Sequence, residues 1–248
     1  MFAVVSMAAA SQAATLTFGP TGWTDQAGDD RDTEWTVIVS DVGVGAGYDY
    51  RVSASYSGGT NTGDIGGVAL AVDGALTGVT TNLVSAIAVG GTDITHLINL
   101  GQCLGEINCG GGANFSGGGN PLTNPFNTLG MDFTAETGSG SSEGVIQTLI
   151  FDVNFDPDVG PLSASLFPAV ALRLQTFGTA PDDGDDSAKL FATGGTLQCP
   201  PGQIRIGEIC GPKTTDDPGV VPLPAGLPLM LTVIGVGAYM RKRARKSA

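Results

Sequence analysis

The sequence is poor in positive charge. Residues 1–240 hold only six lysines and arginines against 24 aspartates and glutamates, a net charge of −18. Such a surface repels the phosphates of nucleic acids, so we exclude DNA and RNA as partners of this part of the chain. It would attract divalent cations or keep the protein soluble outside the cell, and solubility is the favoured interpretation.

A single histidine limits the catalytic chemistry that the chain can support. Residues 140–144 read GSSEG and match G-x-S-x-G, the serine motif of α/β-hydrolases. In that motif the serine lies on a strand-to-helix turn and the histidine follows it in the chain. Here a glycine and serine loop leads into a strand, and His96 precedes the serine. We therefore interpret His96 as a polar surface residue and predict that the protein is not an enzyme.

Aromatic and charged residues are scarce, at 6% and 14%, whereas glycine occurs 39 times. This composition leaves little material for long amphipathic helices and favours strands joined by turns. Residues 48–57, YDYRVSASYS, alternate apolar and polar side chains, which indicates a strand with one buried face. Similar patterns occur at 34–42, 67–74, 144–155 and 169–178. We predict an all-β fold, an antiparallel β-sandwich of jelly-roll or Greek-key type over residues 15–198.

Four cysteines allow three disulfide connectivities. Their spacing favours Cys103 with Cys109 and Cys199 with Cys210, and closing such short loops stabilises a protein by about 2 to 3 kcal/mol each. A zinc site is the alternative, but neither pair has tight ligand spacing and no histidine lies close in sequence. We expect residues 199–220 to form a stapled hairpin followed by a linker.

The first residues resemble a secretory signal. Residues 2–10 are uncharged and mostly apolar, and Ser11 and Ala13 suit positions −3 and −1 of a cleavage site. No lysine or arginine precedes Arg31, so the basic start of a signal peptide is missing. We interpret residues 1–14 as an incomplete signal peptide and expect the reading frame to extend upstream.

The last residues combine an apolar run with a basic end. Residues 225–240 are uncharged and would span about 24 Å as a helix, against a hydrocarbon core of about 30 Å. We predict a single transmembrane helix that leaves the body outside the inner membrane, because the cations stay on the cytoplasmic side. These cations are Arg241, Lys242, Arg243, Arg245 and Lys246.

A strip with two prolines precedes the apolar run. Because of this strip, we interpret the tail as a sorting signal and not as an ordinary membrane anchor. The strip consists of Val221, Pro222, Leu223, Pro224 and Ala225. Its prolines, with Pro228, cannot continue a helix and favour extended backbone before them, so we expect the strip to be extended beside the membrane. Strip, apolar helix and basic end together, residues 221–248, resemble the VPLPA-CTERM variant of the PEP-CTERM sorting signal. The resemblance implies a Gram-negative source and processing by an exosortase, a membrane-embedded cysteine transpeptidase. It implies nothing about the activity of the body.

Two acidic loops are candidate calcium sites, because glycine-bearing loops of carboxylates suit this cation. One contains Asp25, Asp29, Asp30 and Asp32, and the other contains Asp182, Asp183, Asp185 and Asp186. Neither has the spacing of a known calcium motif, and a solvated acidic loop is the favoured alternative. The glycine and asparagine run at 101–130 is a long loop, either functional or disordered.

These features predict an exported cell-surface or exopolysaccharide-matrix protein with a structural or adhesive role. The expected partners are an exosortase-like enzyme, the inner membrane and exopolysaccharide. One alternative is a calcium-dependent carbohydrate-binding module. A polysaccharide-active hydrolase is a weaker alternative, since it needs two facing carboxylates and a groove with aromatic side chains.

Overall fold

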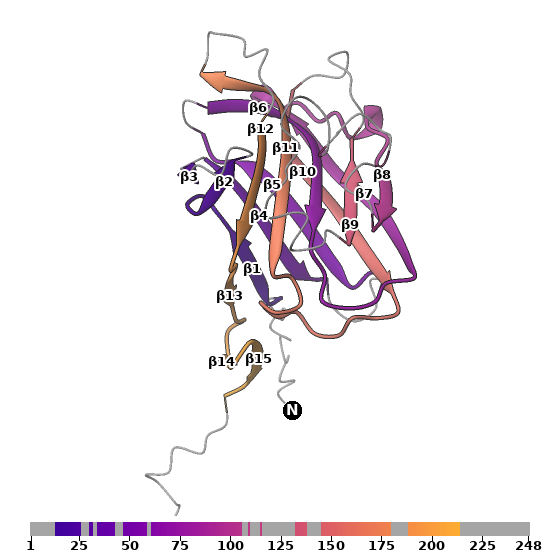
Figure 1. Ribbon diagram of the computed structural model, residues 1–248, viewed down its shortest axis with the longest axis vertical. Coiled ribbons are helices and arrows are strands. Elements are labelled where there is room, and N and C mark those ends of the chain that lie inside the picture. The colour runs from indigo at the N-terminus through magenta and orange to yellow at the C-terminus, as the bar shows by residue number, and fades with distance from the viewer. Residues whose placement is uncertain are drawn as a thin grey trace, which may run out of the picture. The chain divides into compact units, whose positions relative to one another are not determined.

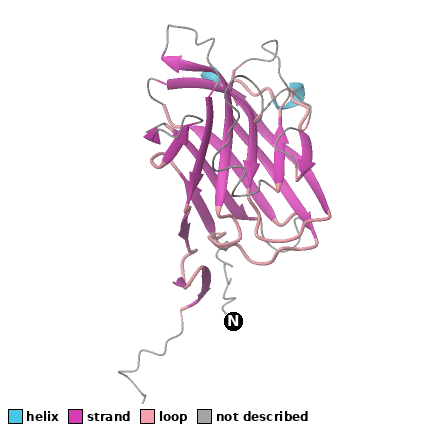
Figure 2. Cartoon of the chain, viewed as in Figure 1, coloured by secondary structure: helices cyan, strands magenta, loops and turns pink. Residues whose placement is uncertain are grey.

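The computed structural model describes residues 13–25, 30–31, 34–42, 47–58, 61–105, 109, 115, 132–137, 145–179 and 188–213. Within these residues the chain forms two antiparallel sheets, a separate hairpin and two short 3-10 helices (Figures 1 and 2). The predicted all-β, antiparallel architecture is therefore confirmed.

Both large sheets combine strands from distant parts of the chain. The six-stranded sheet has the order β13 (Thr196–Gln198), β1 (Thr15–Phe18), β4 (Trp35–Asp41), β5 (Tyr50–Tyr56), β10 (Ile146–Asp156) and β7 (Gly78–Ala88). The seven-stranded sheet has the order β3 (Asp30–Arg31), β2 (Trp23–Asp25), β12 (Ala188–Thr193), β11 (Ala169–Thr179), β6 (Asn61–Leu70), β9 (Phe133–Glu136) and β8 (Gly101–Leu104). The hairpin consists of β14 (Gln203–Ile206) and β15 (Ile209–Pro212), and the 3-10 helices are η1 (Val89–Gly91) and η2 (Thr95–Leu97).

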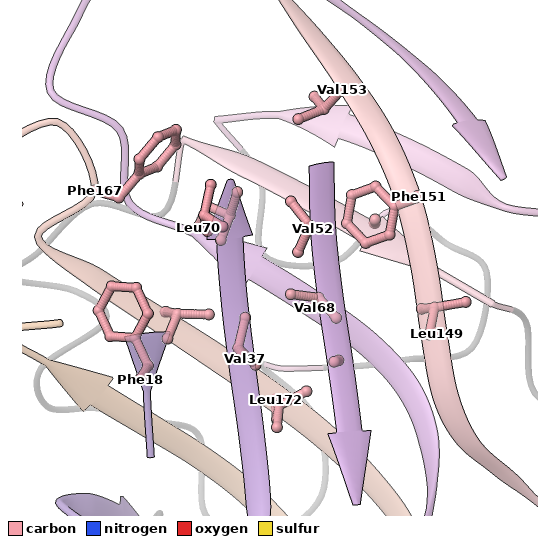
Figure 3. Close-up of a cluster of buried hydrophobic side chains, with 14 of the residues drawn as sticks. Phe18, Val37, Val52, Val68, Leu70, Leu149, Phe151, Val153, Phe167 and Leu172 are labelled. Atoms are coloured by element: carbon pink, nitrogen blue, oxygen red, sulfur yellow. The ribbon is translucent and has the colours of Figure 1, made fainter. Parts of the chain in front are cut away.

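One apolar core lies between the two large sheets. Val52 and Phe151 reach it from the six-stranded sheet, and Val68 and Leu172 reach it from the seven-stranded sheet (Figure 3). All four side chains are fully buried. The packing of two sheets over a shared core agrees with the period-two pattern, which supplies one apolar face for each strand.

Strand β5 shows how closely alternation and burial agree. Tyr50, Val52 and Ala54 point into the core, whereas Arg51 is exposed and Ser53 is half-buried on the opposite face. The alternation in residues 50–54 therefore assigned each side chain to its observed face.

A hydrogen bond between the two tryptophans joins the start of β2 to the start of β4. Both are fully buried, and Nε1 of Trp23 donates a hydrogen bond of 2.9 Å to the carbonyl of Trp35. Gly19 passes between them with φ +86°, and a Cβ there would lie 2.4 Å from the Trp35 carbonyl oxygen. Only glycine fits this crossing, because both its backbone angle and its space exclude a side chain.

β7 is the last strand of the six-stranded sheet and β8 the last strand of the seven-stranded sheet, and the two lie beside each other. Gln102 on β8 donates from Nε2 to the carbonyl of Val79 on β7 at 2.9 Å, and its Oε1 accepts from the hydroxyl of Thr81. A side chain from one sheet thus satisfies a backbone group on the edge strand of the other, which protects that edge from pairing with another chain.

The prediction of an unbroken loop from residue 101 is wrong at its start. Residues 101–104 form β8, which pairs with β9 and is the edge strand of the seven-stranded sheet. The partner strand begins at residue 133, so this pairing is non-local and local sequence does not indicate it.

Among the described residues, no helix has the length and apolar character needed to cross a membrane. The predicted transmembrane segment, residues 225–240, lies outside the described residues, as does nearly all of the predicted signal peptide.

Candidate functional site

A cleft of about 1020 Å³ opens at the end of the sandwich where β4 ends and β5 begins. Its wall combines the two residues before β1, the turn after β10 and the β14–β15 hairpin. The polar groups that line it are the carboxylates Asp41, Asp49 and Asp158 together with Tyr48, Asn154 and Gln203.

Tyr50 forms the buried floor of the cleft. Its ring packs edge-on against Phe167, with ring centroids 5.1 Å apart, and its hydroxyl donates a hydrogen bond to the carbonyl of Gly160. Burial raises the pKa of Tyr50 well above its usual range, and the negative charges of Asp41, Asp49 and Asp158 raise it further. The Tyr50 hydroxyl therefore keeps its proton and acts as a hydrogen-bond donor.

Asp41 is the carboxylate whose pKa is raised in this cleft. Burial is the larger effect, and a hydrogen bond from the backbone N–H of Leu162 partly opposes it. The backbone N–H of Asp41 also donates to the carbonyl of Ala14 at 3.2 Å, which ties the end of β4 to the residue before β1. Asp41 is thus held in place by both of its neighbours in the wall.

The other two carboxylates satisfy backbone groups. Oδ2 of Asp49 accepts from the N–H of Phe155 at 3.2 Å, and Oδ1 of Asp158 accepts from the N–H of Gly160 at 2.8 Å. Each carboxylate keeps a second oxygen that these contacts do not use. The arrangement stabilises the turn after β10 and leaves hydrogen-bond acceptors facing the cleft.

The β14–β15 hairpin forms one wall of the cleft through Pro200, Gln203 and Cys210. A disulfide between Cys199 and Cys210 holds it there, with Cα atoms 5.4 Å apart. The sequence spacing favoured this pairing.

Chemically, the cleft is an acidic cavity with neutral hydrogen-bonding side chains at its rim. Carboxylate, amide and phenol groups together suit a ligand rich in hydroxyl groups, and the negative potential excludes anionic ligands. Within the described residues, no three His, Cys, Asp or Glu side chains are placed to hold a metal ion.

A second cluster of polar side chains lies on the outer face of the seven-stranded sheet. Glu136, Gly67, Arg173 and Lys189 occupy successive strands in one row of pairing. Glu136 and Lys189 are buried and Arg173 is half-buried. Burial lowers the pKa of Arg173, and burial together with the charge of Arg173 lowers the pKa of Lys189.

Cys109 and Phe115, which follow β8 in the chain, both contact this outer face. The structure forms the favoured disulfide between Cys103 and Cys109, and the N–H of Cys109 donates to Oε1 of Glu136 at 2.9 Å. Phe115 is fully buried in a small cluster with Phe191 and four alanines of this face. The four alanines are Ala69, Ala71, Ala169 and Ala171.

Most residues of the predicted sites lie outside the described part of the chain. This holds for the sorting motif at 221–225, the basic residues at 241–246 and the calcium candidates at 182–186. In the other acidic loop, Asp25 ends β2 and Asp30 begins β3, so part of that segment is a short hairpin.

Of the residues considered for hydrolase chemistry, only His96 lies in the described part of the chain. His96 lies exposed on η2. Residues 140–144 fall outside the described residues, and β10 begins just after them at Ile146.

Comparison with protein families, with curated proteins and with solved structures finds no match for this chain. The two disulfides are typical of proteins that fold in an oxidising environment, outside the cytoplasm.

None of the three cleft carboxylates is among the residues that the sequence predicts as a site. A partial signal exists for Asp41 and Asp49, because they flank the glycine-rich connection between two alternating segments. Asp158 lies more than 100 residues later, and only the pairing of β10 with β5 brings it to the same end of the sheet.

Proposed function

We propose that this protein is an exported component of the cell surface or exopolysaccharide matrix, with a structural or adhesive role. The body is a sandwich of jelly-roll or Greek-key connectivity, followed by a single transmembrane helix. An exosortase-like transpeptidase recognises residues 221–248 and sorts the precursor from the inner membrane of a Gram-negative bacterium.

The observation that carries the proposal is the order of features at the C-terminal end. A disulfide-stapled hairpin ends at Pro212, and the proline strip, the apolar run and the basic cluster follow within 36 residues. The disulfides support export, and the apolar run followed by cations supports a membrane anchor with a cytoplasmic end.

The experiment is fractionation of a Gram-negative host that carries an exosortase and expresses the full chain with an epitope in the body. The native chain should reach the surface without its tail. The double variant Pro222→Ala and Pro224→Ala should accumulate as an inner-membrane precursor, because the strip is then free to join the helix. Pro218→Ala, in the linker outside the motif, is the matched control. Equal surface delivery of all three chains would contradict the proposal.

A second candidate function is carbohydrate binding, and the acidic cleft is the observation that favours it. Asn154 and Gln203 offer amide groups and Tyr48 a ring beside the carboxylates, a combination that suits sugar hydroxyls. Calcium-dependent binding would involve the acidic loops that the sequence predicts as calcium sites.

Calorimetric titration with oligosaccharides of the host exopolysaccharide tests this candidate. Binding should be lost in Asn154→Ala and kept in Asn82→Ala, an exposed asparagine on β7. Loss of binding in EDTA would assign the site to a calcium loop, and the appearance of new reducing ends would indicate a hydrolase. Equal heats from the native chain and Asn154→Ala would rule out the cleft.

A further inference from the structure

The β14–β15 hairpin carries three large exposed apolar side chains. Ile204, Ile206 and Ile209 are 43%, 51% and 43% exposed. Strand pairing places Ile206 opposite Ile209 and Ile204 opposite Gly211. Because directly opposed residues of an antiparallel pair project to the same side, the three isoleucines form a single face, called here the isoleucine face.

Gly211 makes this face flat. A Cβ at Gly211 would lie 2.7 Å from Cδ1 of Ile206, so the isoleucine side chain lies across the glycine backbone. Any larger residue at 211 would push Ile206 away from its partner strand. Gly211 therefore lets the Ile206 side chain lie across the partner strand within the isoleucine face.

The opposite side of the hairpin faces the body. Cys210 packs against the main core and is bonded to Cys199 at the end of β13. Gln203 and Cys210 both line the cleft. The attachment fixes the orientation of the hairpin, so its isoleucine face is turned away from the sandwich.

The sequence after the hairpin indicates what this face meets. Only residues 213–224 separate it from the apolar run at 225–240, and 12 residues span at most about 40 Å when fully extended. In an anchored chain the hairpin is thus the part of the body tethered nearest to the bilayer.

We propose that the isoleucine face docks on the outer surface of the lipid bilayer, a proposal that rests on the membrane anchor of the proposed function. Apolar side chains of such a face enter the boundary between headgroups and acyl chains. Docking holds the end of the hairpin at Pro212 at the membrane surface, the side on which a membrane-embedded enzyme acts.

The test places a tryptophan in the isoleucine face of the full chain, in vesicles of phosphatidylethanolamine and phosphatidylglycerol with brominated acyl chains. Bromine quenches tryptophan only in close contact, and the native Trp23 and Trp35 are fully buried and give the same background in every variant. Ile206→Trp is the reporter. Leu97→Trp, at a 45% exposed apolar residue on η2, is the matched control, since both 3-10 helices lie at the end of the sandwich away from the hairpin (Figure 2).

We expect the added emission of Ile206→Trp to be quenched about twofold more than that of Leu97→Trp, because docked side chains lie at the acyl-chain boundary. Adding Ile204→Ser and Ile209→Ser should remove the difference. Equal quenching of the two reporters in chains that float with the vesicles would overturn the docking alone. A blue-shifted but unquenched Ile206→Trp would overturn it in favour of contact between two copies. Failure of the chain to float with vesicles would overturn the anchor and the docking together.

Discussion

The outer faces of the two sheets differ, although both belong to the same sandwich. On the six-stranded sheet, Thr17, Ile38, Ser53 and Ile150 form one row of pairing, and each is only half-buried. On the seven-stranded sheet, the row through Thr134, Ala69 and Ala171 is fully buried. One face thus meets solvent, and the other lies under Phe115.

Charged side chains show the same contrast. Arg51 on the open face forms a bidentate ion pair with Asp152, at 2.7 and 3.0 Å, while its own side chain stays 44% exposed. Lys189 on the covered face is buried, and its pKa is lowered. The covered face therefore requires small residues and buries a cation, whereas on the open face the cation stays exposed and only its partner, Asp152, is buried.

Phe115→Ala should produce the largest loss, because it removes the side chain that covers the alanine cluster. We expect the free energy of unfolding to fall by about 3 to 5 kcal/mol, as for other fully buried phenylalanines. Urea denaturation measures it. Ile150→Ala, on the open face, should cost about 1 kcal/mol. Similar losses for the two variants would mean that the faces do not differ in burial.

Ala171→Leu tests whether the covered face needs small side chains. The extra volume lies against Phe115, so we expect a loss of about 1 to 3 kcal/mol from overpacking. The matched variant on the open face, Ser53→Leu, should change the free energy of unfolding by no more than about 0.5 kcal/mol. An unchanged free energy of unfolding in Ala171→Leu would show that the cluster beneath Phe115 has space for a larger side chain.

Lys189 should give the covered face a pH dependence. Because burial lowers the pKa of Lys189, the unfolded chain holds this proton to higher pH than the folded protein does, and stability rises with pH until the unfolded pKa is passed. The slope contributed by one such proton is at most about 1.4 kcal/mol per pH unit.

The measurement is a denaturation series from about pH 7 to about pH 9, below the pKa of about 10 at which unfolded tyrosines ionise. Lys189→Met should flatten the rise, whereas Lys213→Met, at an exposed position, should leave it unchanged. A rise that survives in Lys189→Met would assign the pH dependence to another group.

Arg51→Lys should have the smallest effect. Lysine keeps the charge beside Asp152 but cannot form both hydrogen bonds, so we expect a loss of about 0.5 kcal/mol that shrinks in high salt. Denaturation at low and high ionic strength measures it. A loss above about 2 kcal/mol, insensitive to salt, would place this pair with the buried groups of the covered face.

The sequence also predicts burial better for the sheet with the open outer face than for the sheet with the covered one. In β5, polar and apolar residues alternate, and the alternation correctly assigned Tyr50 and Val52 to the core. In β11, the outward positions before Arg173 are alanines, so the strand reads as nearly continuous apolar sequence. Such a run is consistent with burial on both faces, but it does not say what covers the second face.

The candidate cleft was harder to predict than the strands. Asp41 and Asp49 flank one connection and could be placed together from sequence, but Asp158 and Gln203 come from elements that meet only after the sheets have formed. The disulfides, in contrast, could be predicted, because each closes a short loop and the spacing of its cysteines in the sequence indicates the pairing.

The sequence by itself determined the features that depend on neighbours in the chain: strand faces, short disulfide loops, and the order of proline strip, apolar run and cations in the tail. The tertiary structure alone decided which face of each sheet is covered, where three carboxylates meet, and which way the isoleucines of the hairpin point. The physical reason is that alternation and loop closure act over a few residues, whereas strand order and the cover over a sheet come from pairings between residues far apart in sequence.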